Sequence, residues 1–209
     1  MVTNGTGTPA GTLSKGDRTR QSILEEALAQ VTRLGFEGLS LGDLAKDAGL
    51  SKSGLYAHFD SKEDLQLQVL KLAADRFIAA VIQPAFARPK GEARVRALYE
   101  LWFDWSRSDF LPGGCIFVAA ANELDDRPGP VRDHLVHEQR RWLGTIAKAF
   151  ASGVEIGQFR QDLECDQSAY EFDGILLAYH HFARLLRLPE AETRARRAFE
   201  ALIDNARAR

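Results

Sequence analysis

Lys52, Ser53 and Gly54 form a short polar segment whose side chains could read the edges of nucleic-acid bases. A lysine can donate to O6 and N7 of guanine, a serine can bond to several bases, and a glycine lets the backbone approach closely. Tyr56 and His58 follow, and both are donors of the kind that bind phosphate oxygens. This chemistry requires a helix whose first turn is exposed, so the elements around the segment decide whether it is available.

Two short helices are expected around this segment. Ser40 can cap the first helix, Gly49 can take the positive φ that ends it, and Ser51 can cap the second. Helices of two turns bury too little to form a core alone. In a helix-turn-helix, a small residue such as Ala45 lets the helices cross, and an apolar residue such as Leu55 anchors the second one. The spacing therefore predicts a helix-turn-helix that presents Lys52, Ser53 and Gly54 to DNA.

Flanking polar groups suit the phosphate backbone. The helix capped by Ser40 offers free amides to an anion, and Lys62 lies in the first turn of the next helix. Arg18, with Lys15 and Arg20, forms a small basic group that could reach a phosphate or the minor groove. Any one of these residues could equally be a cap or a solvated surface group. The whole set at this spacing favours DNA binding.

Composition limits the class of protein. The 209 residues carry 27 Lys and Arg against 29 Asp and Glu, and residues 1 to 62 hold equal numbers of each sign. Specific DNA contacts must then come from where the charges lie, and non-specific affinity should be modest. Two cysteines exclude a disulfide-dense scaffold and indicate a reducing cytoplasm. No apolar run approaches the roughly 18 residues of a membrane span, so we expect no membrane partner.

The remaining apolar spacing is helical throughout, which predicts an all-α protein of nine helices with no strand and no repeat. Residues 1–16 should be a flexible tail, residues 17–62 a three-helix unit, and residues 63–209 a six-helix body. Ser168 should cap a helix over residues 172–188, and Pro189 should begin the last helix.

The segment LSLGDLAKDAGLSKSGLYAHFDSKEDL, residues 39–65, resembles the DNA-binding signature of the TetR family of bacterial transcriptional regulators. The resemblance implies a homodimer whose last two helices form a four-helix interface, with a pocket in each body. It also implies DNA contacts at Ser40, Lys52, Ser53, Tyr56, His58 and Lys62. Gly42 departs from the family, which usually has a longer side chain there. We expect a repressor of a palindromic operator, released by a small-molecule effector and needing no cofactor.

Aromatic residues in the body could line that pocket or simply fill a core. The residues expected to bind the effector are Trp102, Trp105, Cys115, Phe117, Trp142, Tyr179 and His180. The segment from Phe172 to Leu186 is apolar on too many sides for one buried face. A second copy of the chain would cover it, with Gly174 and Ala178 allowing close approach.

Cys115 suggests an alternative, a sensor of oxidants or electrophiles. A thiol in the first turn of a helix has its pKa lowered by the amides and the helix dipole, although cysteines are more often buried and inert. Cys165 is expected in a polar loop. His134 and His137 could share a metal, but no third ligand stands at a fixed spacing. No phosphate-binding loop or nucleophile motif supports an enzyme.

Overall fold

The computed structural model describes residues 14–208. Every regular element within them is a helix, and there are nine when the continuous helical run 62–86 is counted once. The helices are α1 Lys15–Leu34, α2 Leu41–Asp47, α3 Lys52–Tyr56, α4 Lys62–Phe77, the π-helical η1 Ile78–Ile82, α5 Gln83–Phe86, α6 Glu92–Ser106, α7 Ile116–Leu124, α8 Pro130–Glu155, α9 Cys165–Arg184 and α10 Ala191–Ala206. The predicted all-α class is confirmed.

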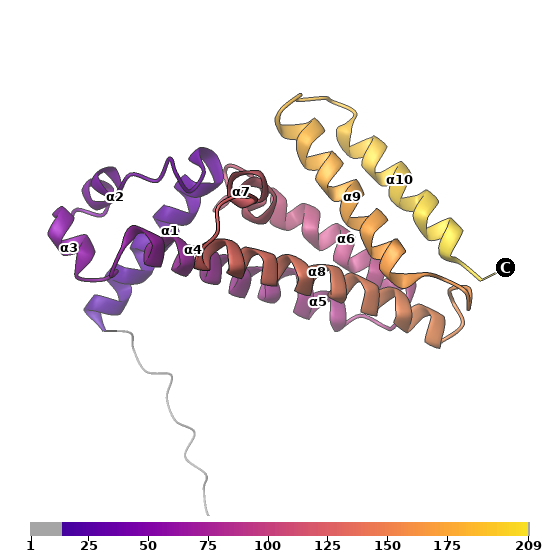
Figure 1. Ribbon diagram of the computed structural model, residues 1–209. Coiled ribbons are helices and arrows are strands. Elements are labelled where there is room, and N and C mark those ends of the chain that lie inside the picture. Colours follow the sequence, from indigo (N-terminus) through magenta and orange to yellow (C-terminus); the bar gives the residue numbers. More distant parts are fainter. Residues whose placement is uncertain (1–13, 209) are drawn as a thin grey trace, which may run out of the picture.

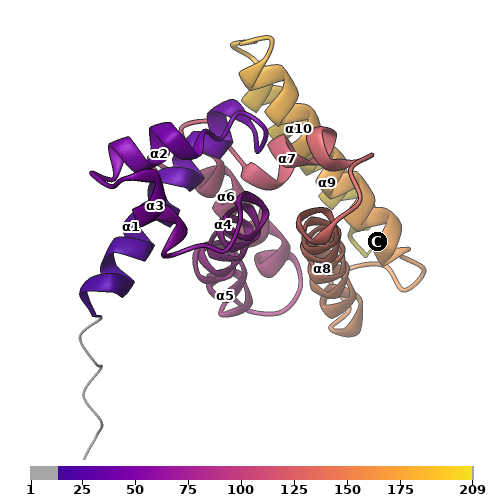
Figure 2. The same ribbon diagram turned by 60° about the vertical axis from the view of Figure 1, so that its left-hand side comes forward.

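Helices α1 to α3 form a small unit at one end of the molecule (Figure 1). Helix α4 packs on α1 and then runs into the body, where it lies along α8. Helices α8, α9 and α10 follow one another side by side, and α7 lies between the small unit and the body (Figure 2). Helices α4 and α7 therefore both connect the two parts.

One apolar core extends through both parts. In the small unit it includes Leu28, Leu44 and Leu55, all of which are buried. In the body, Tyr99 and Phe199 stack with ring centroids 3.9 Å apart. Burial of each such side chain contributes about 1.5–3 kcal/mol, so the core, more than helix propensity, holds the short helices in place.

Helix α1 begins two residues earlier than the sequence indicated. The Ser14 hydroxyl accepts from the Asp17 amide at 3.1 Å, and the Asp17 carboxylate accepts from the Ser14 amide at 3.2 Å. This reciprocal cap places Lys15 and Gly16 in the helix, whereas the sequence assigned them to the tail. Residues 1–13 of that tail lie outside the described residues.

The start of α9 corrects the predicted capping role of Ser168. Helix α9 begins at Cys165, and the Ser168 hydroxyl donates to the Glu164 carbonyl oxygen at 3.0 Å within its first turn. A serine can bond back to the preceding turn as readily as it caps. Cys165 is therefore a helical residue, and the loop predicted for it is wrong.

Candidate nucleic-acid interface and interior cavity

Helices α2 and α3 pack as a helix-turn-helix. Ala45 and Leu55 are both buried between the helices, and the Leu50 amide donates to the Ala45 carbonyl oxygen at 2.8 Å. Gly49 has φ of +66°, a conformation that favours glycine, and it reverses the chain directly after α2. The apolar side of α3 is fixed by these contacts, which leaves its first turn at the surface.

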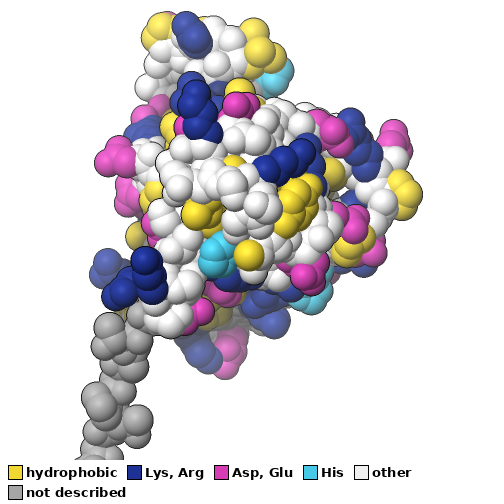
Figure 3. Space-filling view, turned by 90° about the vertical axis from the view of Figure 1, so that its left-hand side faces the viewer, with side chains coloured by type: hydrophobic (Ala, Val, Ile, Leu, Met, Phe, Trp, Pro, Cys, Tyr) yellow, Lys and Arg dark blue, Asp and Glu magenta, His cyan; other side chains and the backbone are white. Residues whose placement is uncertain are grey.

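The first turn of α3 presents the predicted base-reading segment. Lys52 and Ser53 are exposed and Gly54 is half-buried. The Gly54 amide donates to the Ser51 hydroxyl at 3.0 Å, and the Ser53 hydroxyl lies 2.9 Å from that same oxygen. Lys52 makes no ion pair in the described part of the chain, so its ammonium group is available. On this end of the molecule, basic and acidic side chains are interspersed (Figure 3).

The flanking donors also reach solvent. Ser40 is exposed, and its hydroxyl accepts from the Asp43 amide at 3.3 Å, as expected for the cap of α2. Tyr56 is 45% exposed, while His58 is half-buried. Arg18 is exposed in the first turns of α1. All four residues can therefore approach a partner without rearrangement of the fold.

Lys62 has a structural contact that the sequence did not indicate. Its Nζ donates to the Glu37 carbonyl oxygen at 3.0 Å, and the Gln66 side chain donates to the Phe36 carbonyl oxygen at 2.9 Å. From the other side, the Glu123 carboxylate accepts from the Phe36 amide at 2.8 Å and the Glu37 amide at 2.6 Å. The chain after α1 is thus held between α4 and α7.

A second contact ties the segment before α7 to α1. The Gly113 amide donates to the Thr32 hydroxyl at 3.0 Å. A Cβ added at Gly113 would lie 1.6 Å from the Thr32 carbonyl oxygen, so only glycine fits this approach. Arg127, just beyond α7, forms an ion pair with Glu37. Movement of α7 would therefore be transmitted to the small unit.

The body encloses a cavity of about 40 Å³. Its walls come from α4, α6, α7, α8, α9 and the N-cap residue of α7. They are Ala74, Phe77, Trp102, Cys115, Phe117, Val118, Glu138, Gln139, Trp142, Asp173 and Leu177. Four residues predicted to bind an effector meet here, namely Trp102, Cys115, Phe117 and Trp142.

Three other predicted residues lie elsewhere. Trp105 packs behind the cavity wall, with its ring centroid 5.2 Å from that of Phe77. Tyr179 and His180 line a separate hollow beside Arg107 and the start of the loop before α7. The Tyr179 hydroxyl accepts from the Arg107 guanidinium at 3.0 Å, and burial lowers the pKa of His180 to about 4. The sequence could not separate these sites because helical spacing alone does not show which rings share a wall.

Cys115 does not have the predicted low pKa. It is the N-cap residue of α7, one position before the first turn, and it is only 2% exposed. Burial raises the pKa of its thiol, and this effect outweighs the nearby amide of Val118 and the Trp105 indole, which lower the pKa. The thiolate required for the oxidant sensor is disfavoured in this conformation.

Asp173 is a cavity residue that the sequence analysis missed. Its Oδ1 accepts from the Trp142 indole nitrogen at 2.9 Å. Burial raises the pKa of its carboxyl, and the bond from Trp142 opposes that rise. The available signal was an acid within the apolar segment Phe172–Leu177, because a charge on a buried helix face is costly unless it has a partner.

The described residues contain no group of three or more His, Cys, Asp or Glu that could hold a metal ion. His134 is half-buried, and burial lowers its pKa. Between residues 14 and 208, none of the helices is long and apolar enough to cross a membrane.

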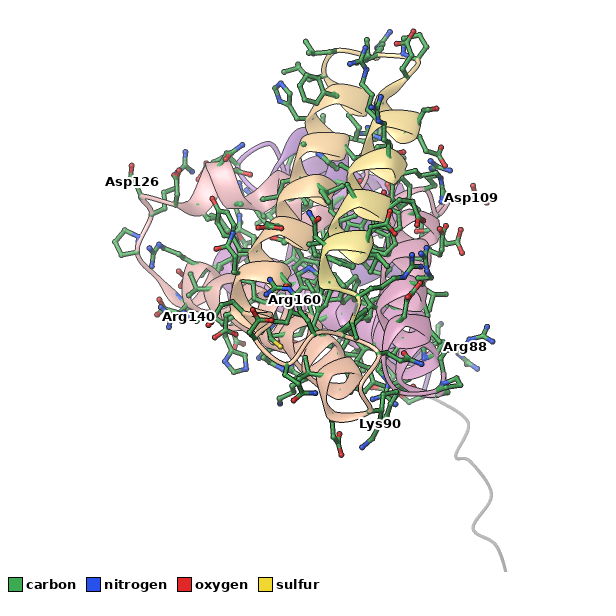
Figure 4. All side chains as sticks on the ribbon, turned by 90° about the vertical axis from the view of Figure 1, so that its right-hand side faces the viewer. Arg88, Lys90, Asp109, Asp126, Arg140 and Arg160 are labelled. Atoms are coloured by element: carbon green, nitrogen blue, oxygen red, sulfur yellow. The ribbon has the colours of Figure 1, made fainter. Side chains whose placement is uncertain are left out.

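A wide apolar groove of about 670 Å³ runs between α9 and α10. Figure 4 shows these two helices side by side on one face of the molecule. Gly174, Ala178 and Phe182 line the groove from α9, and alanines line it from α10. Beyond α9, Leu185 is 71% exposed. An exposed apolar surface of this extent is typical of an interface between protein chains.

An all-α chain with an exposed recognition helix at one end and a cavity in its body is a DNA-binding protein of the helix-turn-helix class. Residues 23–69 match the family described as bacterial regulatory proteins, tetR family, and residues 91–199 match the tetracyclin repressor-like C-terminal domain. The chain belongs to the TetR family of transcriptional regulators, whose members are not enzymes.

Two curated relatives are regulators from mycobacteria. The transcriptional activator FasR of Mycolicibacterium smegmatis is 32% identical over 106 residues, which is 48% of each chain. The transcriptional repressor DhaR of Mycobacterium sp. strain GP1 is 28% identical over 151 residues, 70% of this chain and 73% of that protein. The match to FasR thus spans about half of its length.

Solved structures share the fold over most of the chain. A TetR regulator from Chloroflexus aurantiacus has a TM-score of 0.74 and 26% identity, covering 92% of this chain and 96% of that one. A regulator from Saccharomonospora viridis in complex with choline has a TM-score of 0.76 and 24% identity, with coverage of 92% and 100%. AibR in complex with isovaleryl coenzyme A and operator DNA has a TM-score of 0.65 and 21% identity, covering 78% and 85%.

Proposed function

We propose that this regulator is a repressor that binds a palindromic operator as a homodimer and is released when a small molecule enters the cavity of the body. The observation that supports this proposal most is the exposed first turn of α3, where Lys52 forms no ion pair in the described part of the chain. Helices α4 and α7 connect the unit that carries α3 to the cavity.

The groove between α9 and α10 supports the dimer. A two-fold axis would place this self-complementary apolar face against its copy and form a four-helix interface. Small residues such as Gly174 and Ala178 allow the backbones to approach. In the dimer, the two α3 helices would enter successive major grooves about 34–36 Å apart, which matches a palindrome.

At each half-site, Lys52, Ser53 and Gly54 would meet base edges. Ser40, Tyr56, His58, Lys62 and Arg18 would contact the phosphate backbone and set the register. Lys62 can do so while keeping its bond to the Glu37 carbonyl oxygen, because an ammonium group has three donors.

Two routes would transmit effector binding. Phe77 lies in the cavity wall on α4, about 22 Å along the helix from Lys62 at 1.5 Å per residue. Cys115 and Phe117 border the cavity at α7, which also holds Phe36 and Glu37 through Glu123. An effector that separates the walls would move both helices and change the spacing of the two α3 helices.

Solved structures of this fold support a small-molecule site and an operator site on such a regulator. AibR was solved with both an acyl coenzyme A and operator DNA, and the Saccharomonospora regulator was solved with choline. Repression is proposed because DhaR, a repressor, is matched over more of its length than the activator FasR.

The test is selection of bound duplexes from a random pool, followed by affinity measurements on the enriched sequence. Lys52→Ala should relax the base preference, because the contact to a base edge is lost. Lys62→Ala should weaken binding to all sequences and reduce the salt dependence by about one phosphate contact. Lys148→Ala removes an exposed lysine of α8 and should leave both the base preference and the salt dependence unchanged. Equal effects of Lys52→Ala and Lys62→Ala would contradict this division of roles.

A further inference from the structure

Aromatic rings form much of the cavity wall. Phe77, Trp102, Phe117 and Trp142 all line it. Phe77 lies at the centre of the group, with ring centroids 5.1 Å from Trp142 and 5.8 Å from Phe117, both in edge-to-face geometry. The face of such a ring carries negative electrostatic potential, so a cation that lies over one of these faces would be attracted to it.

The polar groups of the lining are hydrogen-bond acceptors. Asp173 and Glu138 contribute carboxylates. Gln139 donates one N–H of Nε2 to the Phe117 carbonyl oxygen at 3.0 Å, and its amide oxygen adds a further acceptor. The lining contains no Lys, Arg or His. An occupant that matches these groups must supply hydrogen-bond donors.

Of the two carboxylates in the lining, that of Asp173 has fewer partners to balance its charge. Its only hydrogen-bond partner in the described residues is the Trp142 indole nitrogen, and it forms no ion pair there. Glu138, in contrast, binds Arg141 at 3.0 Å and is 12% exposed. Asp173 is half-buried, and a partly desolvated carboxylate without a cation is unfavourable, so a cationic ligand beside it would lower that cost.

We propose that the cavity binds the ammonium head group of an organic amine, with Asp173 as its counter-ion and the four rings around it. A volume of about 40 Å³ accepts only a small head group in this conformation. Leu177 is 41% exposed at the cavity edge, so a longer ligand would extend past it toward solvent. The inference names a ligand class for the effector site and in that respect rests on the proposed function.

The experiment follows tryptophan fluorescence of the full chain without DNA, since Trp102 and Trp142 line the cavity. Methylammonium chloride and tetramethylammonium chloride are titrated at constant ionic strength, with tert-butanol as the uncharged comparison. Asp173→Asn keeps an acceptor for Trp142 and removes the charge. Asp104→Asn is the control, because it makes the same change at an exposed position of α6.

We expect saturable binding of at least one ammonium salt, no response to tert-butanol, at least ten-fold weaker binding in Asp173→Asn and unchanged binding in Asp104→Asn. No saturable response, an equal response to tert-butanol, or unchanged binding in a folded Asp173→Asn would overturn the proposal. If Asp173→Asn does not fold, the proposal is decided by the wild type, from its response to the ammonium salts compared with its response to tert-butanol. Because DNA is absent, failure here leaves operator binding untouched, and failure of operator binding leaves the cation site untouched.

Discussion

At the scale of single residues, the environment of a side chain decides its chemistry. Cys115 is at the start of a helix, a position that lowers a thiol pKa, yet burial raises it. The desolvation of the thiolate outweighs the helix start because Cys115 is closed off by the walls of the body.

This difference predicts the order in which the thiols react. Cys165→Ser leaves Cys115 as the one cysteine, and this variant should react with Ellman's reagent at least ten-fold more slowly than Cys115→Ser, whose remaining Cys165 is half-buried. In guanidinium chloride, both variants should react at the same rate. A native Cys115 that reacts as fast as Cys165 would restore the sensor hypothesis.

His180 predicts a pH dependence of stability. Its pKa is about 4 in the folded chain, lowered first by burial and then by Arg184, against about 6.5 when unfolded. As pH falls from 6.5 toward 4, the unfolded chain takes up the proton first, so the folded state loses stability. Allowing for partial exposure of the ring, the loss is about 1–2 kcal/mol.

Chemical denaturation at pH 7 and pH 4.5 measures that loss, with His180→Leu as the reference. The wild type should lose about 1–2 kcal/mol more than the variant between the two pH values. Equal losses would mean that His180 is protonated in the folded chain.

The sequence predicted the local features well and the buried ones poorly. Ser40, Ser51 and Ser61 cap helices as expected, because a cap depends on residues three positions apart. The contacts of Asp173 and Glu123 join residues 31 and 87 positions apart, and no local pattern contains them.

At the scale of elements, α7 is the part whose role the sequence did not indicate. It borders the cavity at one end and holds the chain after α1 through Glu123 at the other. The helices expected after Ser40 and Ser51 begin where predicted, whereas α9 begins seven residues before the predicted residue 172, and Ser168 bonds within it.

Removal of the Glu123 contact should loosen the junction between the two parts. Glu123→Ala leaves the amides of Phe36 and Glu37 without their acceptor, which costs about 1–3 kcal/mol. We expect those two amides to exchange hydrogen at least ten-fold faster, measured by NMR. Asp126→Ala, exposed just beyond α7, should leave them unchanged, and equal exchange in the two variants would count against the contact.

At the scale of the whole molecule, the two ends differ in the surface they present. On the small unit of α1 to α3, basic and acidic side chains are interspersed, whereas the groove between α9 and α10 is apolar. A surface of mixed sign gives weak non-specific attraction to DNA, so operator affinity should depend on specific contacts, which the proposed dimer would make twice.

A charge in the groove should therefore separate the dimer and weaken DNA binding together. Ala178→Glu places a carboxylate on the apolar face of α9. Sedimentation should show monomers, and operator affinity should fall at least ten-fold because each chain reaches only one half-site. Ala151→Glu, on exposed α8, should remain dimeric. A dimeric Ala178→Glu would place the interface elsewhere.

The most direct test of sequence-specific DNA binding is the ratio of dissociation constants for the selected duplex and for the same duplex with its bases shuffled. Fluorescence anisotropy at about 150 mM salt gives both constants, near physiological ionic strength. Sequence-specific recognition by a dimer predicts a ratio of about 10³ or more, with two chains bound per selected duplex. A ratio near one would contradict sequence-specific recognition by this chain.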